Sequence, residues 1–154
     1  MAYIFRPLEQ TDAAAIAAWR YNDPYSFYNL DQDPKDLAEF MDPANWPERY
    51  FAVCDEANGL VGFFGFEREN SGWVTIGLGM RPDLTGRGLG KAFLEAGLAF
   101  ARERWQPEVF ALGVAAFNER AIRLYERVGF VRVHQYMQAT NGGHYPFVSM
   151  VRGG

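Results

Sequence analysis

The chain has 154 residues, of which 49% are hydrophobic and 22% charged, and its formal net charge is −4. This length predicts a single domain over residues 1–154, and the composition is typical of a folded globular protein rather than a disordered one. The negative charge argues against a basic nucleic-acid-binding surface, the single cysteine excludes an internal disulfide bond, and two histidines argue against a histidine-rich metal site. From this composition we expect no metal site and no nucleic-acid partner. Neither a secretory signal nor 18 uninterrupted apolar residues is visible, so we also expect no membrane contact and a cytoplasmic location.

The N-terminal part is expected to form a strand and then a helix. Residues 3–7 predict a short strand that a proline ends. Thr11 is a candidate N-cap for a helix reaching about Arg20, whose apolar face would carry Ala14, Ala15, Ala18 and Trp19. Four X-Pro pairs between residues 21 and 50 then leave room for at most one short helix, at residues 34–41.

Three strands are expected next, at residues 50–54, 60–66 and 73–80. The first two flank a five-residue hairpin loop that ends in Asn58-Gly59. In the third strand, Gly77 and Gly79 interrupt the apolar pattern, and such glycines often mark a close approach by a ligand or another backbone. Tight packing under an aromatic side chain such as Trp73 is the other interpretation, and the sequence does not decide between them.

A glycine-rich turn, Thr85-Gly86-Arg87-Gly88-Leu89-Gly90, lies between this third strand and a helix expected to end near Trp105. Glycines permit positive φ and a close ligand approach, and the first N–H groups of the helix favour an anion such as a pyrophosphate. The spacing fits neither the dinucleotide fingerprint, whose third glycine would fall at Lys91, nor a Walker A loop, because Ala92 follows Gly90-Lys91. A connection that binds nothing explains the turn alone equally well.

The rest of the chain predicts a strand at residues 109–114, a helix at 118–128 and two last strands around Asn141-Gly142-Gly143. Asn118 is suited to cap the helix, and Gly129 to end it in a left-handed conformation. Tyr125 lies close to two turns after Asn118 and shares its face, where it fits either a ligand site or a half-buried core position. These elements predict an α/β layered fold whose sheet combines hairpins with at least one crossover.

Two of these segments together resemble the GNAT superfamily of N-acetyltransferases. The residues from Gly77 to Pro82, followed by those from Thr85 to Gly90, are similar to its motif A, and residues 118–130 are similar to its motif B. The resemblance is clear over residues 73–130 and implies a mixed, mostly antiparallel central sheet with helices on both faces. Thr85 departs from the family pattern, which usually has Gln or Arg there.

The resemblance implies acetyl-CoA as the cofactor. The backbone N–H groups from about Arg87 to Lys91 would hold the pyrophosphate. The pantetheine would pair with the strand around residues 78–80, between it and the strand ending at Val114, and Asn118 would contact the pantetheine arm. The residues expected to bind or border the cofactor are Leu78, Gly79, Met80, Thr85, Gly86, Arg87, Gly88, Leu89, Gly90, Lys91, Asn118, Ala121 and Arg123.

The resemblance also implies a reaction, in which a primary amine attacks the acetyl group directly and Tyr125 is the general acid. A phenol has an ordinary pKa near 10, so it can give its proton to a departing thiolate of comparable basicity. The general base stays open: many relatives carry a glutamate about where Val74 stands. The candidates are Glu67 acting through a water, Asp23, or no base at all.

In the family, the segment over residues 21–50 forms the acceptor wall. Here it holds seven acidic and two basic residues among many aromatic ones, which suits a cationic amine, either a small molecule or a peptide. A solvated loop with its aromatic side chains in the core is an equal alternative. The rival function is a non-catalytic acyl-CoA-binding sensor or interaction module, which is supported by Val74 at the position where many relatives carry a glutamate. The last strands leave room for a homodimer.

Overall fold

The computed structural model describes residues 2–154, which form one seven-stranded sheet, four α-helices and four short 3-10 turns. The strands are β1 (Ile4–Pro7), β2 (Tyr50–Asp55), β3 (Gly59–Arg68), β4 (Trp73–Met80), β5 (Val109–Ala115), β6 (Val131–Thr140) and β7 (Gly143–Gly153). The helices are α1 (Gln10–Ala17), α2 (Pro34–Met41), α3 (Gly90–Trp105) and α4 (Glu119–Arg127). The 3-10 turns are η1 (Tyr25–Tyr28), η2 (Leu30–Gln32), η3 (Pro43–Asn45) and η4 (Pro82–Leu84).

The strand order is β1-β2-β3-β4-β5-β7-β6, and the predicted mixed, mostly antiparallel sheet is confirmed. Strand β4 pairs in parallel with β5, from Trp73 opposite Val109 to Thr75 opposite Ala111, and α3 makes the crossover between them. Cα packing divides the chain into two compact units. Unit 1 comprises the chain up to Gly65 together with Leu78–Thr85, and unit 2 comprises Phe66–Gly77 and Gly86–Gly154.

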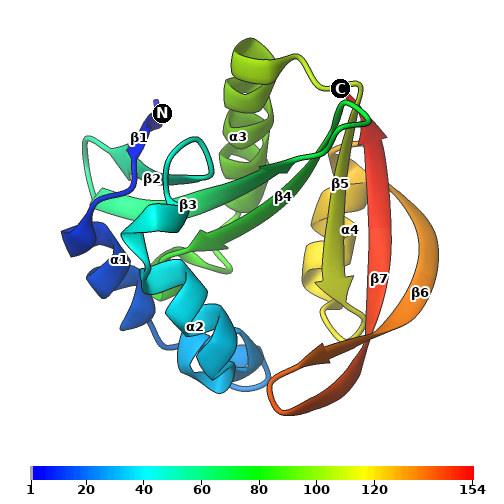
Figure 1. Cartoon of the computed structure of the whole chain (residues 1–154), viewed down its shortest axis with the longest axis horizontal. Coiled ribbons are helices and arrows are strands. Elements are labelled where there is room, and N and C mark those ends of the chain that lie inside the picture. The colour runs from blue at the N-terminus through cyan, green and yellow to red at the C-terminus, as the bar shows by residue number, and fades with distance from the viewer. Residues whose placement is uncertain (1) are drawn as a thin grey trace. The chain divides into compact units, whose positions relative to one another are not determined.

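Unit 1 contains the antiparallel strands β1 and β2, most of β3, and helices α1 and α2, which pack against each other (Figure 1). A hydrophobic core cluster of this unit consists of Leu8, which lies between β1 and α1, together with Ala13 and Ile16 of α1, Phe40 of α2 and Ala52 of β2. Helix α2 has the predicted bounds, because Asp33 caps its first N–H groups and Pro34 occupies the first turn. The segment between α1 and β2 also contains η1, η2 and η3, three short turns that the proline pattern did not predict.

The first helix differs from its prediction at both ends and in its buried face, and it ends at Ala17 rather than near Arg20. Thr11 does not cap α1; Glu9 is the N-cap residue, and its N–H donates to the Asp12 carboxylate at 3.0 Å. This change of cap residue starts the helix at Gln10. The buried face carries Asp12, Ala13 and Ile16, whereas three alanines of the predicted face are exposed and its Trp19 packs against the unit 1 core.

Unit 2 contains strands β5, β7 and β6, with β7 lying between the other two, and helices α3 and α4 (Figure 1). The predicted turn between β6 and β7 is confirmed: Asn141 and Gly142 both have positive φ, as a two-residue hairpin turn of type I′ requires. Strand β6 lies at the end of the strand order and exposes Val131, Val133 and Met137. Within residues 2–154, none of the helices has the length and apolar character needed to cross a membrane.

Candidate functional site

The glycine turn (Thr85–Gly90) adopts a backbone conformation that favours glycine. Gly86 and Gly88 have φ of 72° and 75°, in the left-handed region that side chains disfavour. A Cβ atom placed on Gly88 would meet nothing within 4 Å, so no neighbouring group fills the space beside it. The turn therefore presents exposed backbone that a ligand can approach closely.

The first turn of α3 lacks a side-chain cap. Its N-cap residue is Leu89, which has no polar atom to accept from the following N–H groups, whereas Asp33 caps α2 and Asn118 caps α4. The start of this 16-residue helix therefore favours an anion, through its N–H groups and the helix dipole. Arg87 and Lys91 are exposed beside these groups. The donors present fit a phosphate group.

Helix α4 is fixed at both ends in the predicted way. The Asn118 side chain is buried and its Oδ1 accepts from the Ala121 N–H at 3.1 Å, and Gly129 follows the helix with φ of 100°. Tyr125 is half-buried, and its ring lies 6.0 Å from the Phe130 ring in an edge-on arrangement. The phenol therefore sits on a helix whose ends are held by local contacts.

The two glycines of β4 have different surroundings. A Cβ atom on Gly79 would collide with the Phe63 ring, whereas one on Gly77 would meet nothing within 4 Å. Packing under an aromatic side chain therefore explains Gly79. The aromatic residue is Phe63 of β3 and not Trp73, because the facing neighbour is set by strand pairing and not by proximity in sequence.

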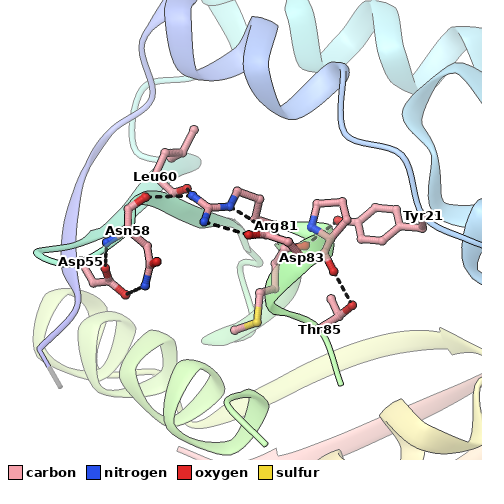
Figure 2. Close-up of polar contacts among 9 residues, drawn as sticks. Tyr21, Asp55, Asn58, Leu60, Arg81, Asp83 and Thr85 are labelled. Carbon is pink, nitrogen blue, oxygen red and sulfur yellow. Dashed lines mark hydrogen bonds and ion pairs between the residues drawn. The ribbon is translucent and has the colours of Figure 1, made fainter. Parts of the chain in front are cut away.

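Within unit 1, the last residue of β4 is held from the segment that follows α1. The Tyr21 hydroxyl donates to the carbonyl oxygen of Met80 at 2.7 Å, and Figure 2 shows the phenol pointing toward the end of this strand. Burial raises the pKa of Tyr21 to about 12, so the hydroxyl keeps its proton at neutral pH. Tyr21 thus fixes Met80, one of the residues that the sequence assigns to cofactor binding.

Arg81 ties the end of β4 to the β2–β3 hairpin (Figure 2). Its Nη1 donates to the carbonyl oxygens of Asn58 at 2.8 Å and Leu60 at 3.0 Å, and its Nε donates to Asp83 at 2.6 Å. The ion pair and hydrogen bond with Asp83 raise the pKa of Arg81 further above its ordinary value. One side chain therefore connects the hairpin, the strand end and η4.

Sequence reasoning assigned no role to the side chain of Arg81 and placed Tyr21 only among the aromatic residues of the acceptor segment. Each acts over a long sequence separation, so no local signal identifies its partner. Thr85, in contrast, makes a local contact: its Oγ1 donates to the Pro82 carbonyl at 2.8 Å and closes η4. This contact gives the residue that departs from the family pattern a structural role.

The candidate general bases lie in different units. Glu67 is exposed near the end of β3, in the part that belongs to unit 2. Asp23 is exposed in unit 1 and accepts a hydrogen bond from Ser26. Val74 is buried, with 2% of its surface exposed. The role of Glu67 stays a prediction.

Several acidic residues of the segment over residues 21–50 have local structural roles. They cap helical turns or pair with arginines: Asp33 caps α2, Asp42 caps η3, Asp31 pairs with Arg20 and Glu39 pairs with Arg49. Among its aromatic residues, Phe40 is buried, and Trp46 and Tyr50 pack against the unit 1 core. For these residues, the structure favours a structural role over a place in an acceptor wall.

Comparison with known proteins links this geometry to a family. The acetyltransferase (GNAT) domain matches residues 3–131 of the chain. The mycothiol acetyltransferase of Streptomyces coelicolor is 34% identical over 123 residues, which cover 78% of this chain and 37% of that protein. That of Propionibacterium freudenreichii is 37% identical over 97 residues, which cover 60% of this chain and 29% of that protein. The chain thus spans about a third of the length of these curated relatives.

Solved structures show the same fold. The spermidine N-acetyltransferase from Vibrio cholerae, in complex with CoA and spermine, matches 97% of this chain and 94% of its own with a TM-score of 0.77 at 21% identity. A GNAT-family acetyltransferase from Bacillus anthracis matches 98% of this chain and 94% of its own with a TM-score of 0.76 at 16% identity. The motif resemblance is therefore confirmed, and the chain belongs to the GNAT family of acetyltransferases, which use acetyl-CoA.

Proposed function

We propose that the protein transfers the acetyl group of acetyl-CoA to a primary amine of a cationic small molecule or peptide, by direct attack of the amine. The observation that carries the proposal is the open glycine turn, with positive φ at Gly86 and Gly88, leading into a helix whose N-cap is an apolar leucine. Such a turn offers backbone N–H groups to a pyrophosphate. The family match supports this use of the turn.

On the donor side, the N–H groups over residues 87–91 bind the pyrophosphate, and the backbone over residues 78–80 binds the pantetheine. Asn118 contacts the pantetheine arm. Its capping bond to Ala121 orients the amide, because the carbonyl oxygen is directed to the helix. Thr85 and Gly86 border the cofactor at the turn, and Arg123 reaches a phosphate from α4.

Tyr125 is the general acid in this proposal. The amine nitrogen forms a bond to the thioester carbonyl carbon, the carbon–sulfur bond breaks, and the Tyr125 hydroxyl gives its proton to the departing sulfur. The amine's surplus proton leaves to Glu67 through a water, to Asp23, or directly to solvent. No enzyme nucleophile takes part, so Cys54 has no role in the reaction.

The acceptor is proposed as a cationic amine because the chain is acidic overall and its relatives include an enzyme named for spermidine and solved with spermine. The sequence relatives are named mycothiol acetyltransferase and not polyamine acetyltransferase, so the acceptor class has to be tested directly. A panel containing spermidine, spermine and lysine-containing peptides, with CoA release as the readout, separates polyamines from peptide acceptors.

The test combines cofactor binding with turnover. Titration calorimetry of the wild type with acetyl-CoA is expected to give one site with micromolar affinity, about −8 kcal/mol. In Tyr125→Phe, kcat is expected to fall about 100-fold or more, while the Kd for acetyl-CoA stays unchanged because the ring packing is retained. Unchanged turnover would refute the role of Tyr125, and absent binding would refute the cofactor site.

The rival function predicts a different pattern. A non-catalytic acyl-CoA sensor binds acetyl-CoA with the same stoichiometry but releases no CoA with any amine of the panel. Turnover with one amine, lost in Tyr125→Phe, supports the enzyme and excludes the sensor.

A further inference from the structure

Within unit 2, helix α4 lies along the part of the glycine turn from Gly86 to Gly90. A Cβ atom on Gly90 would lie 2.9 Å from the Leu124 side chain, and one on Gly86 would lie 3.8 Å from Nη1 of Arg120. Gly90 follows Gly86 by four positions in the turn, and Leu124 follows Arg120 by four positions in α4. The face of α4 that carries Arg120 and Leu124 therefore runs beside the segment from Gly86 to Gly90.

This arrangement brings a guanidinium group to the anion-favouring turn. Arg120 follows the cap residue Asn118 by two positions, so the cap that fixes the start of α4 also fixes where this side chain emerges. Arg123, in contrast, lies 4.0 Å from Glu119, one turn back on the same helix, and its side chain is 63% exposed. The two arginines carry the same charge on one helix, but the contacts place Arg120 beside the turn.

The chemistry of the two groups is complementary. A guanidinium presents several N–H donors in a rigid plane and binds phosphate oxygens in pairs, and charge-assisted hydrogen bonds of this kind are stronger than neutral ones. The turn supplies backbone N–H groups from one side, and α4 supplies Arg120 from beside Gly86. A pyrophosphate carries enough oxygens to accept from both.

We propose that Arg120 is a binding residue for the pyrophosphate of acetyl-CoA, acting together with the backbone of the glycine turn. The proposal rests on the cofactor site of the proposed function, and it assigns a phosphate contact to a residue that the sequence motifs did not single out. Because Arg120 lies beside Gly86, in the turn that the proposed function assigns to the pyrophosphate, the proposal concerns the pyrophosphate and not the 3′-phosphate.

The experiment measures the Kd of CoA and of dephospho-CoA, which lacks the 3′-phosphate, for the wild type and three variants. Arg120→Gln is expected to weaken both ligands about tenfold, the effect of one charged hydrogen bond. Arg120→Lys keeps the charge but not the planar fork, so its loss is expected to be smaller. Arg127→Gln is the matched control, because it removes the same charge from an exposed side chain about two turns further along α4, and it is expected to alter either Kd less than about twofold.

Each other outcome overturns the proposal in a defined way. A loss confined to CoA, with dephospho-CoA unaffected, would assign Arg120 to the 3′-phosphate. Equal losses in Arg120→Gln and Arg127→Gln would show a general charge effect and no specific contact. Unchanged affinity in Arg120→Gln would remove the contact but leave the proposed function intact, whereas absent binding by the wild type would remove the cofactor site itself.

Discussion

The hydroxyl of Tyr21 donates a 2.7 Å hydrogen bond to the carbonyl oxygen of Met80, 59 residues later in the chain. The contact joins the segment after α1 to the last residue of β4 within unit 1. Because the donor lies outside the sheet, the end of β4 is held by a side chain in addition to its strand neighbours. Ionisation of Tyr21 would remove the proton that it donates to Met80, so the hold on the end of β4 depends on the neutral form of this tyrosine.

Replacing Tyr21 with Phe is expected to lower the free energy of unfolding by about 1 kcal/mol, because the Met80 carbonyl loses a partner while the ring packing remains. Urea unfolding at pH 7 measures the change. Burial raises the pKa of Tyr21 to about 12, so the contribution of its neutral form is complete below pH 10 and is lost as the pH rises through 12. Burial also raises the pKa values of Tyr3 and Tyr136, so an absorbance titration of the phenolates should show one late-ionising tyrosine fewer in Tyr21→Phe than in the wild type; identical titration curves would contradict the assignment.

Gly79 and Gly77 provide a matched pair of substitutions on one strand. Gly79→Ala is expected to destabilise the protein by about 1–3 kcal/mol, because the added methyl group collides with the Phe63 ring. Gly77→Ala meets open space and is expected to stay within about 0.5 kcal/mol of the wild type.

A double-variant cycle tests the cause of the Gly79→Ala effect. In a Phe63→Ala background the ring is gone, so Gly79→Ala should cost much less than in the wild type, and the difference is the coupling energy between the two sites. Chemical unfolding of the four proteins gives this number. Equal costs in both backgrounds would mean that the strand backbone, and not the ring, requires glycine.

The elements that the sequence predicted well are those with local signals. Helix α2 has a capping aspartate followed by proline, and α4 has Asn118 before it and Gly129 after it. Strand β4 has apolar residues at alternate positions from Val74 to Met80 and is bounded by turns, and the structure gives it the predicted bounds. In each case the deciding contacts lie within a few residues of one another.

Contacts across long sequence separations were not predictable in the same way. Arg81 reaches carbonyl groups that precede it by more than 20 residues, and Arg120 comes beside Gly86 through the packing of α4 against the start of α3. The prediction that Thr11 caps α1 was wrong, although the signal is local. Glu9 is the cap residue instead, because its N–H donates to Asp12 and Arg6 donates to both carboxylates. Strand register and helix packing, which decide these partners, are not written in any single segment.

Asp12 predicts a pH dependence of stability on the acid side. Burial alone would raise the pKa of Asp12, but hydrogen bonds from Arg6 and from the Glu9 N–H outweigh it and lower the pKa. The carboxylate's contribution is therefore present above pH 4 and is lost as the pH falls through the lowered pKa of the folded state. The stability that Asp12 contributes should accordingly persist, as the pH is lowered, until Asp12 is protonated.

Asp12→Asn is expected to lower the free energy of unfolding at pH 7 by about 1–3 kcal/mol, since Arg6 then loses its charged partner. Glu9→Gln is the control, because Glu9 is 68% exposed and its ion pair with Arg6 is expected to contribute less than about 1 kcal/mol. Urea unfolding at pH 7 and pH 3 should show the gap between the wild type and Asp12→Asn narrowing at the lower pH. A gap of equal size at both values would contradict the lowered pKa.

Gly88 and Gly142 separate backbone strain from ligand binding. They have φ of 75° and 76°, and a Cβ atom on either would meet nothing within 4 Å. Gly88→Ala and Gly142→Ala should therefore lower the free energy of unfolding by similar amounts, about 1–2 kcal/mol each, through the same left-handed conformation. Only at Gly88, in the glycine turn, should the affinity for acetyl-CoA also fall, and Gly88→Asp should abolish binding because it adds a negative charge at an anion site. Calorimetry of all three variants against the wild type gives the answer: equal affinity in Gly88→Asp and Gly142→Ala would show that the pyrophosphate binds elsewhere.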